Sequence, residues 1–323
     1  MKKYISTFLF ITVTFLTLGV SCGGIGGDDE AQTTGPAGFF VTTDKGQNWQ
    51  QISKMPNADG VQSLSGASVF KVFSDPQDPK AMYWASRNKG LYYTWDEGQT
   101  WRHASSPLNS GFIRGVAVHP KDKCLVYVTN GKRVYRSNDC LRSWEEVYRE
   151  SRDQVTITSI RFHDNSPYEL YLTKNNGDFL VSRDTAESWT VLNRFSGAYL
   201  EKVLVGGGDS ESIYVASRDS GLYRSDDRGE NWVNLNEPLD EFAGGLTYRR
   251  AMTHPNESGK LYWISKYGIL VSTDKGESWE ALELITEPGS VDIYGFAINP
   301  DDDSEIYYTA TADVSTGDST FYF

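Results

Sequence analysis

Residues 272–279 read STDKGESW, and this eight-residue phrase recurs with small changes five more times along the chain. Each copy has serine or threonine first, aspartate third and tryptophan eighth. The copies occupy residues 42–49, 94–101, 137–144, 182–189, 225–232 and 272–279. Successive tryptophans are 52, 43, 45, 43 and 47 residues apart, which is the length of a four-stranded propeller blade. Six copies at this spacing predict a β-propeller.

The phrase itself is expected to form a tight turn. Its aspartate accepts backbone N–H groups within the turn, glycine two residues later supplies a left-handed backbone, and the tryptophan fills the apolar layer beneath. We assign this structural role to Asp44, Trp49, Asp96, Trp101, Asp139, Trp144, Asp184, Trp189, Asp227, Trp232, Asp274 and Trp279. Leu141 and Ala186 stand where the other copies have glycine, so we expect those two turns to relax or distort.

Each phrase lies within the same order of elements: an apolar strand, a turn, a second strand, a hairpin, a third strand, the phrase and a fourth strand. The first phrase has no strand pair before it, whereas the strands at 294–300 and 305–311 have no phrase after them. We therefore expect an all-β propeller of six four-stranded blades, with the ring closed by N- and C-terminal strands. TFYF at 320–323 repeats the place of GFFV at 38–41, so a truncated seventh blade is the alternative.

The N-terminus has the layout of an export signal. Lys2 and Lys3 precede an uncharged run at 4–20, and Cys22 is followed by a polar, glycine-rich stretch. This arrangement resembles the bacterial lipoprotein signal. The resemblance implies a signal peptide at 1–21, an acylated Cys22 with a flexible tether at 22–38, and a propeller at 39–323 held in the bacterial cell envelope. Gly19 stands where that family has leucine, so an ordinary cleaved secretory signal is the alternative.

The net charge of the chain indicates which class of partner to exclude, and its cysteines indicate a disulfide. The net charge is -12, and removal of Lys2 and Lys3 with the signal leaves 29 basic against 43 acidic side chains, or -14, so we expect no nucleic-acid partner. In an oxidising compartment Cys124 and Cys140 are expected to form a disulfide, with two buried thiols as the alternative.

Three histidines occupy one repeat position, the turn between the first two strands of their blades. They are His119, His163 and His254, and Asp75 and Asn299 fill the same place elsewhere. Equivalent residues lie on different blades, so we interpret them as turn residues and predict no metal site and no cofactor.

The repeats from residue 39 to residue 323 are similar to the BNR or Asp-box propellers, which include sialidases, sortilin-type receptors, glucan-cleaving enzymes and photosystem II assembly-factor-like proteins. The resemblance to the assembly-factor group implies a non-enzymatic module that binds a protein or peptide. A sialidase would carry an early Phe/Tyr-Arg-Ile-Pro segment, and neither Arg114 in FIRG nor Arg161 in SIRF lies in such a segment.

Two repeat positions gather cations at the end of the blades opposite the phrase. They hold Arg87, Arg114, Lys174, Arg218, Arg249 and Lys266. We expect these side chains to converge around the central channel and to bind an acidic protein or peptide; ordinary solvated charges are the alternative. A glycan-directed hydrolase or lectin is the alternative function, for which Trp84, Trp263, Tyr294 and Tyr307 would offer aromatic platforms.

Overall fold

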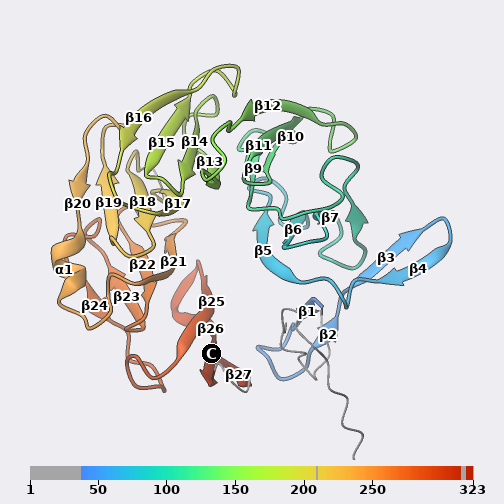
Figure 1. The fold of residues 1–323 in the computed structure, drawn as a ribbon. Coiled ribbons are helices and arrows are strands. Elements are labelled where there is room, and N and C mark those ends of the chain that lie inside the picture. Colours follow the sequence, from blue (N-terminus) through green and yellow to red (C-terminus); the bar gives the residue numbers. More distant parts are fainter. Residues whose placement is uncertain (1–37, 209, 314–317, 323) are drawn as a thin grey trace, which may run out of the picture. The chain divides into compact units, whose positions relative to one another are not determined.

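The computed structural model describes residues 38–208, 210–313 and 318–322. The predicted signal peptide, Cys22 and the tether up to residue 37 lie outside the described residues. Within the described part, the chain forms five four-stranded antiparallel sheets, each a meander with its strands in chain order (Figure 1). No helix among these residues is long and apolar enough to cross a bilayer. The prediction of an all-β propeller is confirmed.

The five sheets are called the first to fifth blades. The first contains β5 (Val69–Ser74), β6 (Met82–Ser86), β7 (Leu91–Thr94) and β8 (Arg102–His103). The second contains β9 (Gly115–His119), β10 (Asp122–Thr129), β11 (Arg133–Ser137) and β12 (Glu145–Arg149). The third contains β13 (Ile157–Phe162), β14 (Leu170–Lys174), β15 (Asp178–Ser182) and β16 (Thr190–Arg194). The fourth contains β17 (Leu200–Val205), β18 (Ile213–Ser217), β19 (Leu222–Ser225) and β20 (Val233–Asn234). The fifth contains β21 (Tyr248–Thr253), β22 (Leu261–Ser265), β23 (Ile269–Ser272) and β24 (Glu280–Ala281), and the short helix α1 (Asn236–Asp240) precedes it.

The second strand of each blade is the centre of its core. Every residue of β14, β18 and β22 is buried, as expected for strands covered on both faces. One tyrosine recurs at the same place in all five blades and is almost completely buried each time. These residues are Tyr83, Tyr127, Tyr171, Tyr214 and Tyr262. Neighbouring blades therefore pack through clusters that contain an equivalent aromatic side chain.

All six copies of the phrase form the same turn. In the fifth copy the Ser225 hydroxyl donates to Asp227, 2.8 Å away, and accepts the Gly229 N–H at 2.7 Å. Asp227 also accepts the backbone N–H and the side-chain amide of Asn231, and these bonds lower the pKa of Asp227 to about 2. The seventh residue of the phrase, always asparagine, threonine or serine, thus completes the turn, a contribution that the sequence analysis missed.

The expectation that two turns distort is wrong. Leu141 and Ala186 adopt φ of 69° and 73°, in the left-handed region, and both donate their N–H to the first serine of their phrase as glycine does elsewhere. Both side chains are buried in the core. The strain of a left-handed non-glycine residue is about 1 kcal/mol, and burial of the side chain offsets it.

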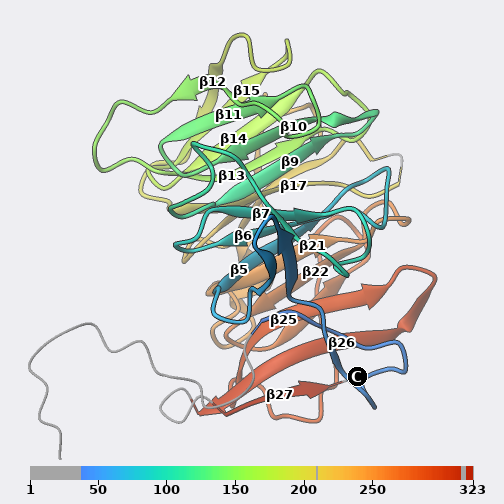
Figure 2. The same ribbon diagram turned by 90° about the vertical axis from the view of Figure 1, so that its right-hand side faces the viewer.

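The prediction of six four-stranded blades, or of a seventh, is corrected by the C-terminal sheet. That sheet has three strands, β25 (Asp292–Asn299), β26 (Asp302–Asp313) and β27 (Asp318–Tyr322), seen as one long sheet in Figure 2. β1 (Phe40–Val41) pairs only with β2 (Gln50–Gln51), and β3 (Lys54–Asn57) pairs with β4 (Gly60–Ser63). Because β27 pairs with the edge of β26 where β1 was expected, the N- and C-terminal strands do not close a blade.

The β1–β2 pair instead packs on the first blade. Phe39 contacts the rings of Trp84 and Trp101, with centroids 5.6 and 5.4 Å away, and the Trp101 indole N–H donates to the Ile52 carbonyl at 2.6 Å. An ion pair, 2.5 Å from Lys45 to Glu305, joins the first phrase to β26.

Candidate functional site

The first strands of four blades and of the C-terminal sheet share an irregularity in their pairing. β5, β13, β17, β21 and β25 each skip one residue in their pairing with the second strand, which is a β-bulge. The skipped residues are Phe70, Thr158, Glu201, Arg249 and Tyr294. A bulge breaks the strict alternation of faces and re-aims side chains at the edge of a sheet. Adjacent residues of one strand are thereby brought to the same cavity.

That cavity has a volume of about 740 Å³ and is lined by the first strands of all five blades and by β25. Its charged lining is mainly basic: Lys71, Arg87, Arg114, Arg161, Lys202, Arg218, Arg249 and Arg250, against Asp164 and Glu201. Four of the six predicted cations, Arg87, Arg114, Arg218 and Arg249, therefore lie around one cavity. In a chain of net charge -12, this is a focused positive site.

The four predicted arginines are held by different partners. Arg218 donates to Glu201 at 2.7 Å and lies over the Tyr199 ring, and Arg249 donates to Asp292 at 2.9 Å. Arg114 lies over the Phe112 ring, 4.5 Å from its centroid, and Arg87 lies over the same ring at 5.6 Å. The aromatic contacts hold the guanidinium groups in place and leave their N–H donors free for a ligand.

Lys174 and Lys266 do not line this cavity. Lys174 is buried, and its ammonium donates to Glu150 at 2.6 Å and to the Tyr148 hydroxyl at 2.5 Å. Arg152 also binds Glu150, and the hydrogen bonds from Arg152 and then Lys174 hold the pKa of Glu150 well below its usual value against the effect of burial. Lys174 is thus part of a buried ion pair between the second and third blades.

Four cations of the cavity were missed by the sequence analysis. One is Arg161, and the other three are Lys71, Lys202 and Arg250. These last three occupy one repeat position, four residues before the turn between the first two strands, directly after the bulged residue. Burial and, after it, neighbouring cations together lower the pKa of Lys71 to about 8 and place the pKa of Lys202 well below its usual value. The sequence repeats show that these three positions are equivalent, but they do not show the bulge. The bulge is what directs the three side chains into the cavity.

The carboxylates of the cavity are already engaged. Asp164 accepts both hydrogen bonds of Arg161 at 2.9 and 3.0 Å, and Glu201 accepts from Arg218. Glycoside hydrolysis needs two carboxyl groups flanking the scissile bond. Among the described residues that line the cavity, no pair of carboxylates is free for that role.

Of the four aromatic platforms considered, Trp84 and Trp263 are fully buried in the blades. Tyr294 is 51% exposed and lines the cavity beside Arg250, whose guanidinium Nε donates to the Tyr294 carbonyl at 2.9 Å. One aromatic face is therefore presented to a ligand.

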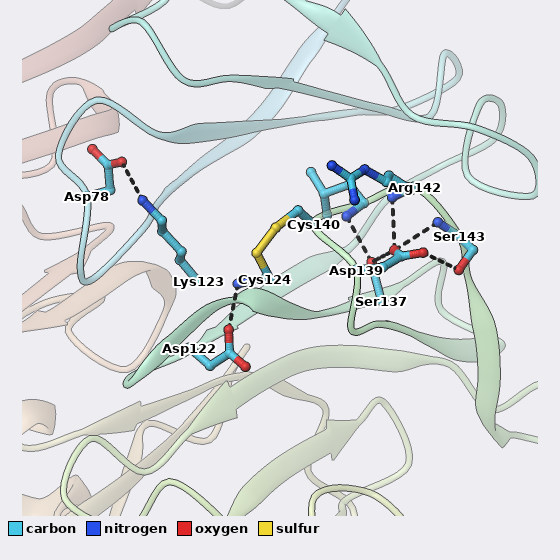
Figure 3. The surroundings of a disulfide bond; sticks show 10 residues. Asp78, Asp122, Lys123, Cys124, Ser137, Asp139, Cys140, Arg142 and Ser143 are labelled. Atoms are coloured by element: carbon cyan, nitrogen blue, oxygen red, sulfur yellow. Dashed lines mark hydrogen bonds and ion pairs between the residues drawn. A yellow bond between two sulfur atoms is a disulfide. The ribbon is translucent and has the colours of Figure 1, made fainter.

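The predicted disulfide is present. Cys124 and Cys140 are bonded and join the start of β10 to the third phrase, beside the hydrogen bonds of Asp139 (Figure 3). The Cys140 N–H donates to the Cys124 carbonyl at 3.3 Å. The bond closes the turn of the phrase onto its own blade.

Each repeated histidine accepts a backbone N–H from two residues later through Nδ1, at 3.1 Å for His119 and 3.2 Å for His163 and His254. Asp75 and Asn299 accept the equivalent N–H groups through their side-chain oxygens. The interpretation of these histidines as turn residues is confirmed.

One group of possible metal ligands exists among the described residues. His254, Glu257 and Asp303 have ligand atoms within 4.8 Å of one another. The ammonium of Lys260 forms ion pairs with both carboxylates, and His254 Nε2 lies 2.9 Å from Asp303. Both carboxylates are therefore already paired with the Lys260 side chain.

Comparison with known proteins gives relatives of two kinds. Residues 37–133 match the Sortilin-Vps10 family (sortilin, neurotensin receptor 3). The chain is 26% identical over 196 residues to a probable oligoxyloglucan-reducing end-specific xyloglucanase of Neosartorya fischeri, covering 53% of this chain and 24% of the relative. It is 23% identical over 225 residues to sortilin of Rattus norvegicus, covering 60% and 24%. The chain thus spans about a quarter of the length of these curated relatives.

Solved structures share the fold. The xyloglucanase of family GH74 from Xanthomonas campestris aligns with a TM-score of 0.66 at 16% identity, covering 89% of this chain and 51% of that one. A structure described as YCF48 bound to D1 peptide aligns with a TM-score of 0.58 at 16% identity, covering 76% and 75%. This protein is a β-propeller similar to those of sortilin and YCF48 on one side and of the xyloglucanases on the other.

Proposed function

We propose that this chain binds the acidic side chains of a protein or peptide at the cavity of the inner strands, without catalysis. The observation that carries the proposal is the charge of that cavity: eight cationic side chains line it, and its two carboxylates are each bound to an arginine. A ligand with carboxylates supplies the charge that the cavity lacks and gains charge-assisted hydrogen bonds.

The comparisons supply a specific reason for a second candidate, a glycan-directed function. The xyloglucanases among the relatives and the exposed ring of Tyr294 in the cavity support it, and sequence similarity favours it over peptide binding. Against hydrolysis stands the engagement of Asp164 and Glu201 by arginines. In this candidate the cavity holds a sugar against the Tyr294 ring.

One experiment separates the two candidates. The full chain is used to capture proteins from solubilised bacterial envelope and is applied in parallel to an array of glucans that includes xyloglucan oligosaccharides. A variant with Arg87, Arg114, Arg218 and Arg249 changed to alanine is compared with the parent. The control changes Arg102, Arg142, Arg149 and Arg194, exposed arginines outside the cavity, to alanine and has the same net charge.

The proposal predicts that the parent and the control retain the same specific protein and that the cavity variant loses it. It also predicts that this binding weakens as salt increases, because charged contacts in partly exposed sites are screened. Retention by both variants would reject the cavity as the site of peptide binding. Binding of a glucan without any captured protein would reject peptide binding and support the second candidate.

We further propose that the chain is exported and anchored at Cys22 in the bacterial cell envelope, on the sequence features of residues 1–38. Mass spectrometry of the mature N-terminus tests this. A diacylated or triacylated Cys22 is the expected result, and an unmodified N-terminus that begins elsewhere would contradict it.

A further inference from the structure

The residues that directly follow three of the bulges are long and basic. Lys71 on β5, Lys202 on β17 and Arg250 on β21 come from three different blades but occupy one repeat position. The same position on β9 and β13 holds Gly115 and Ser159, which also line the cavity. Three long cationic side chains therefore face a space that the small residues of the other two blades leave open.

These three cations, like Arg87 and Arg114, differ from the remaining basic residues of the cavity in their partners. Arg161, Arg218 and Arg249 each bind a carboxylate. Lys202 donates to the Ala251 carbonyl at 2.8 Å and Arg250 donates to the Tyr294 carbonyl at 2.9 Å, while Lys71 lies over the Phe70 ring. Among the described residues, none of the three forms an ion pair within 4.0 Å.

The three groups are close enough to repel one another. After burial, the charge of Arg250 is the next cause that lowers the pKa of Lys71, and the charges of Lys71 and Arg250 are the next causes for Lys202. Arg114 and Arg161 add to the repulsion, and Glu201 opposes it at Lys71. Bringing like charges together in a partly buried cavity is unfavourable unless an anion binds between them.

We propose that Lys71, Lys202 and Arg250 form a binding site for a tetrahedral oxyanion, a phosphate or sulfate group, at the inner strands of the propeller. Such a group carries enough oxygen atoms for each cation to receive its own, whereas a carboxylate carries two. The proposal deepens the proposed function and rests on it in one respect: the oxyanion is the anionic group of the ligand bound in the same cavity.

The test is isothermal titration calorimetry of the full chain with sodium phosphate, sodium sulfate and sodium acetate at constant ionic strength. Phosphate and sulfate are expected to bind, and acetate at least ten-fold more weakly. Lys71→Met, Lys202→Met and Arg250→Met are each expected to weaken phosphate binding about ten-fold or more, the effect of removing one charge-assisted hydrogen bond. Arg102→Met, outside the cavity, is the matched control and is expected to bind phosphate as the parent does.

Folding is followed independently by thermal unfolding with and without phosphate. Phosphate is expected to raise the melting temperature of the parent and of Arg102→Met, and to raise that of each cavity variant less at the same phosphate concentration. If the parent does not bind phosphate or sulfate, or if the three variants bind phosphate as tightly as the parent, the proposal is wrong. Equal binding of acetate and phosphate would also overturn it, since a carboxylate site would then explain the data.

The source of the oxyanion is identified by comparing the binding of inorganic phosphate, a phosphoserine peptide and a sulfated oligosaccharide. The peptide and the oligosaccharide are each also compared with their unmodified form. Tighter binding of one modified ligand names the source, and equal binding of all three names a free anion. The experiments distinguish failure of the oxyanion site from failure of the proposed peptide-binding function. Capture of an envelope protein without phosphate binding would remove the oxyanion site alone, and phosphate binding without any captured partner would remove the peptide-binding function alone.

Discussion

Replacing Lys174 by methionine is expected to destabilise the propeller and to leave partner binding at the cavity unchanged. The Lys174 side chain and the Glu150 carboxylate are each about 2% exposed, and their charges meet at 2.6 Å. Removing one partner of a buried pair costs about 3 to 5 kcal/mol. Arg152 still binds Glu150 in the variant, so we expect about 3 kcal/mol, at the low end of that range.

The free energy of unfolding is measured by urea denaturation at pH 7, with Lys174→Met/Glu150→Leu as the second variant. The double variant removes both charges and is expected to recover most of the loss, because no uncompensated charge remains buried. A loss below about 1 kcal/mol for Lys174→Met, or an equal loss in both variants, would refute the buried ion pair as the cause.

The Lys174–Glu150 ion pair also predicts that the stability it contributes decreases as the pH falls. The pKa of Glu150 is lower in the folded protein than in the unfolded chain, so its contribution is complete above the unfolded value of 4.5. The contribution is lost as pH falls from there through the folded pKa. The difference between parent and Lys174→Met is therefore expected to shrink below about pH 4.5 when denaturation is repeated at acid pH.

Three further predictions concern stability. Cys140→Ser is expected to lower the free energy of unfolding by about 3 kcal/mol, since the disulfide closes a loop of 16 residues; urea denaturation without reductant measures it. Ala186→Gly is expected to change that free energy by less than about 1 kcal/mol, because relief of the left-handed strain offsets the lost methyl burial, whereas Leu141→Gly loses about 2 kcal/mol or more. Burial lowers the pKa of His119 and His254. Their contribution to the free energy of unfolding should therefore be complete above about pH 6.5 and be lost as the pH drops through the lowered values. The variant His119→Asn/His254→Asn should flatten this profile when the free energy of unfolding is measured between pH 8 and pH 5.

Each of these three stability predictions would be contradicted by one particular result. Equal stability of parent and Cys140→Ser in the absence of reductant would show that the disulfide does not constrain the unfolded chain. A large loss in Ala186→Gly would mean that the methyl group matters more than the strain. An unchanged pH profile in the double histidine variant would remove the turn histidines as the titrating groups.

The blade was predictable because its information is local. The eight-residue phrase carries its own hydrogen-bond donors and acceptors, and the hydroxyl and carboxylate contacts of Ser225 and Asp227 lie within seven residues. The turn role of His119 follows from a bond to a backbone N–H two residues later. The disulfide is of the same kind, since a hairpin brings Cys140 back to Cys124.

The closure of the ring and the membership of the cavity were decided by tertiary structure. Two similar segments, at 38–41 and 320–323, suit the same edge of β26, and only their competition in the folded chain places β27 there. The sequence analysis aligned Lys174 with Arg218, but the strand register places Lys174 at the position of Ser217, and Glu150 binds it in the core. Lys71, Lys202 and Arg250 face the cavity because a bulge before each one interrupts the alternation of the strand. Local patterns set the repeat, whereas contacts between distant segments determine which edge is filled and where a side chain points.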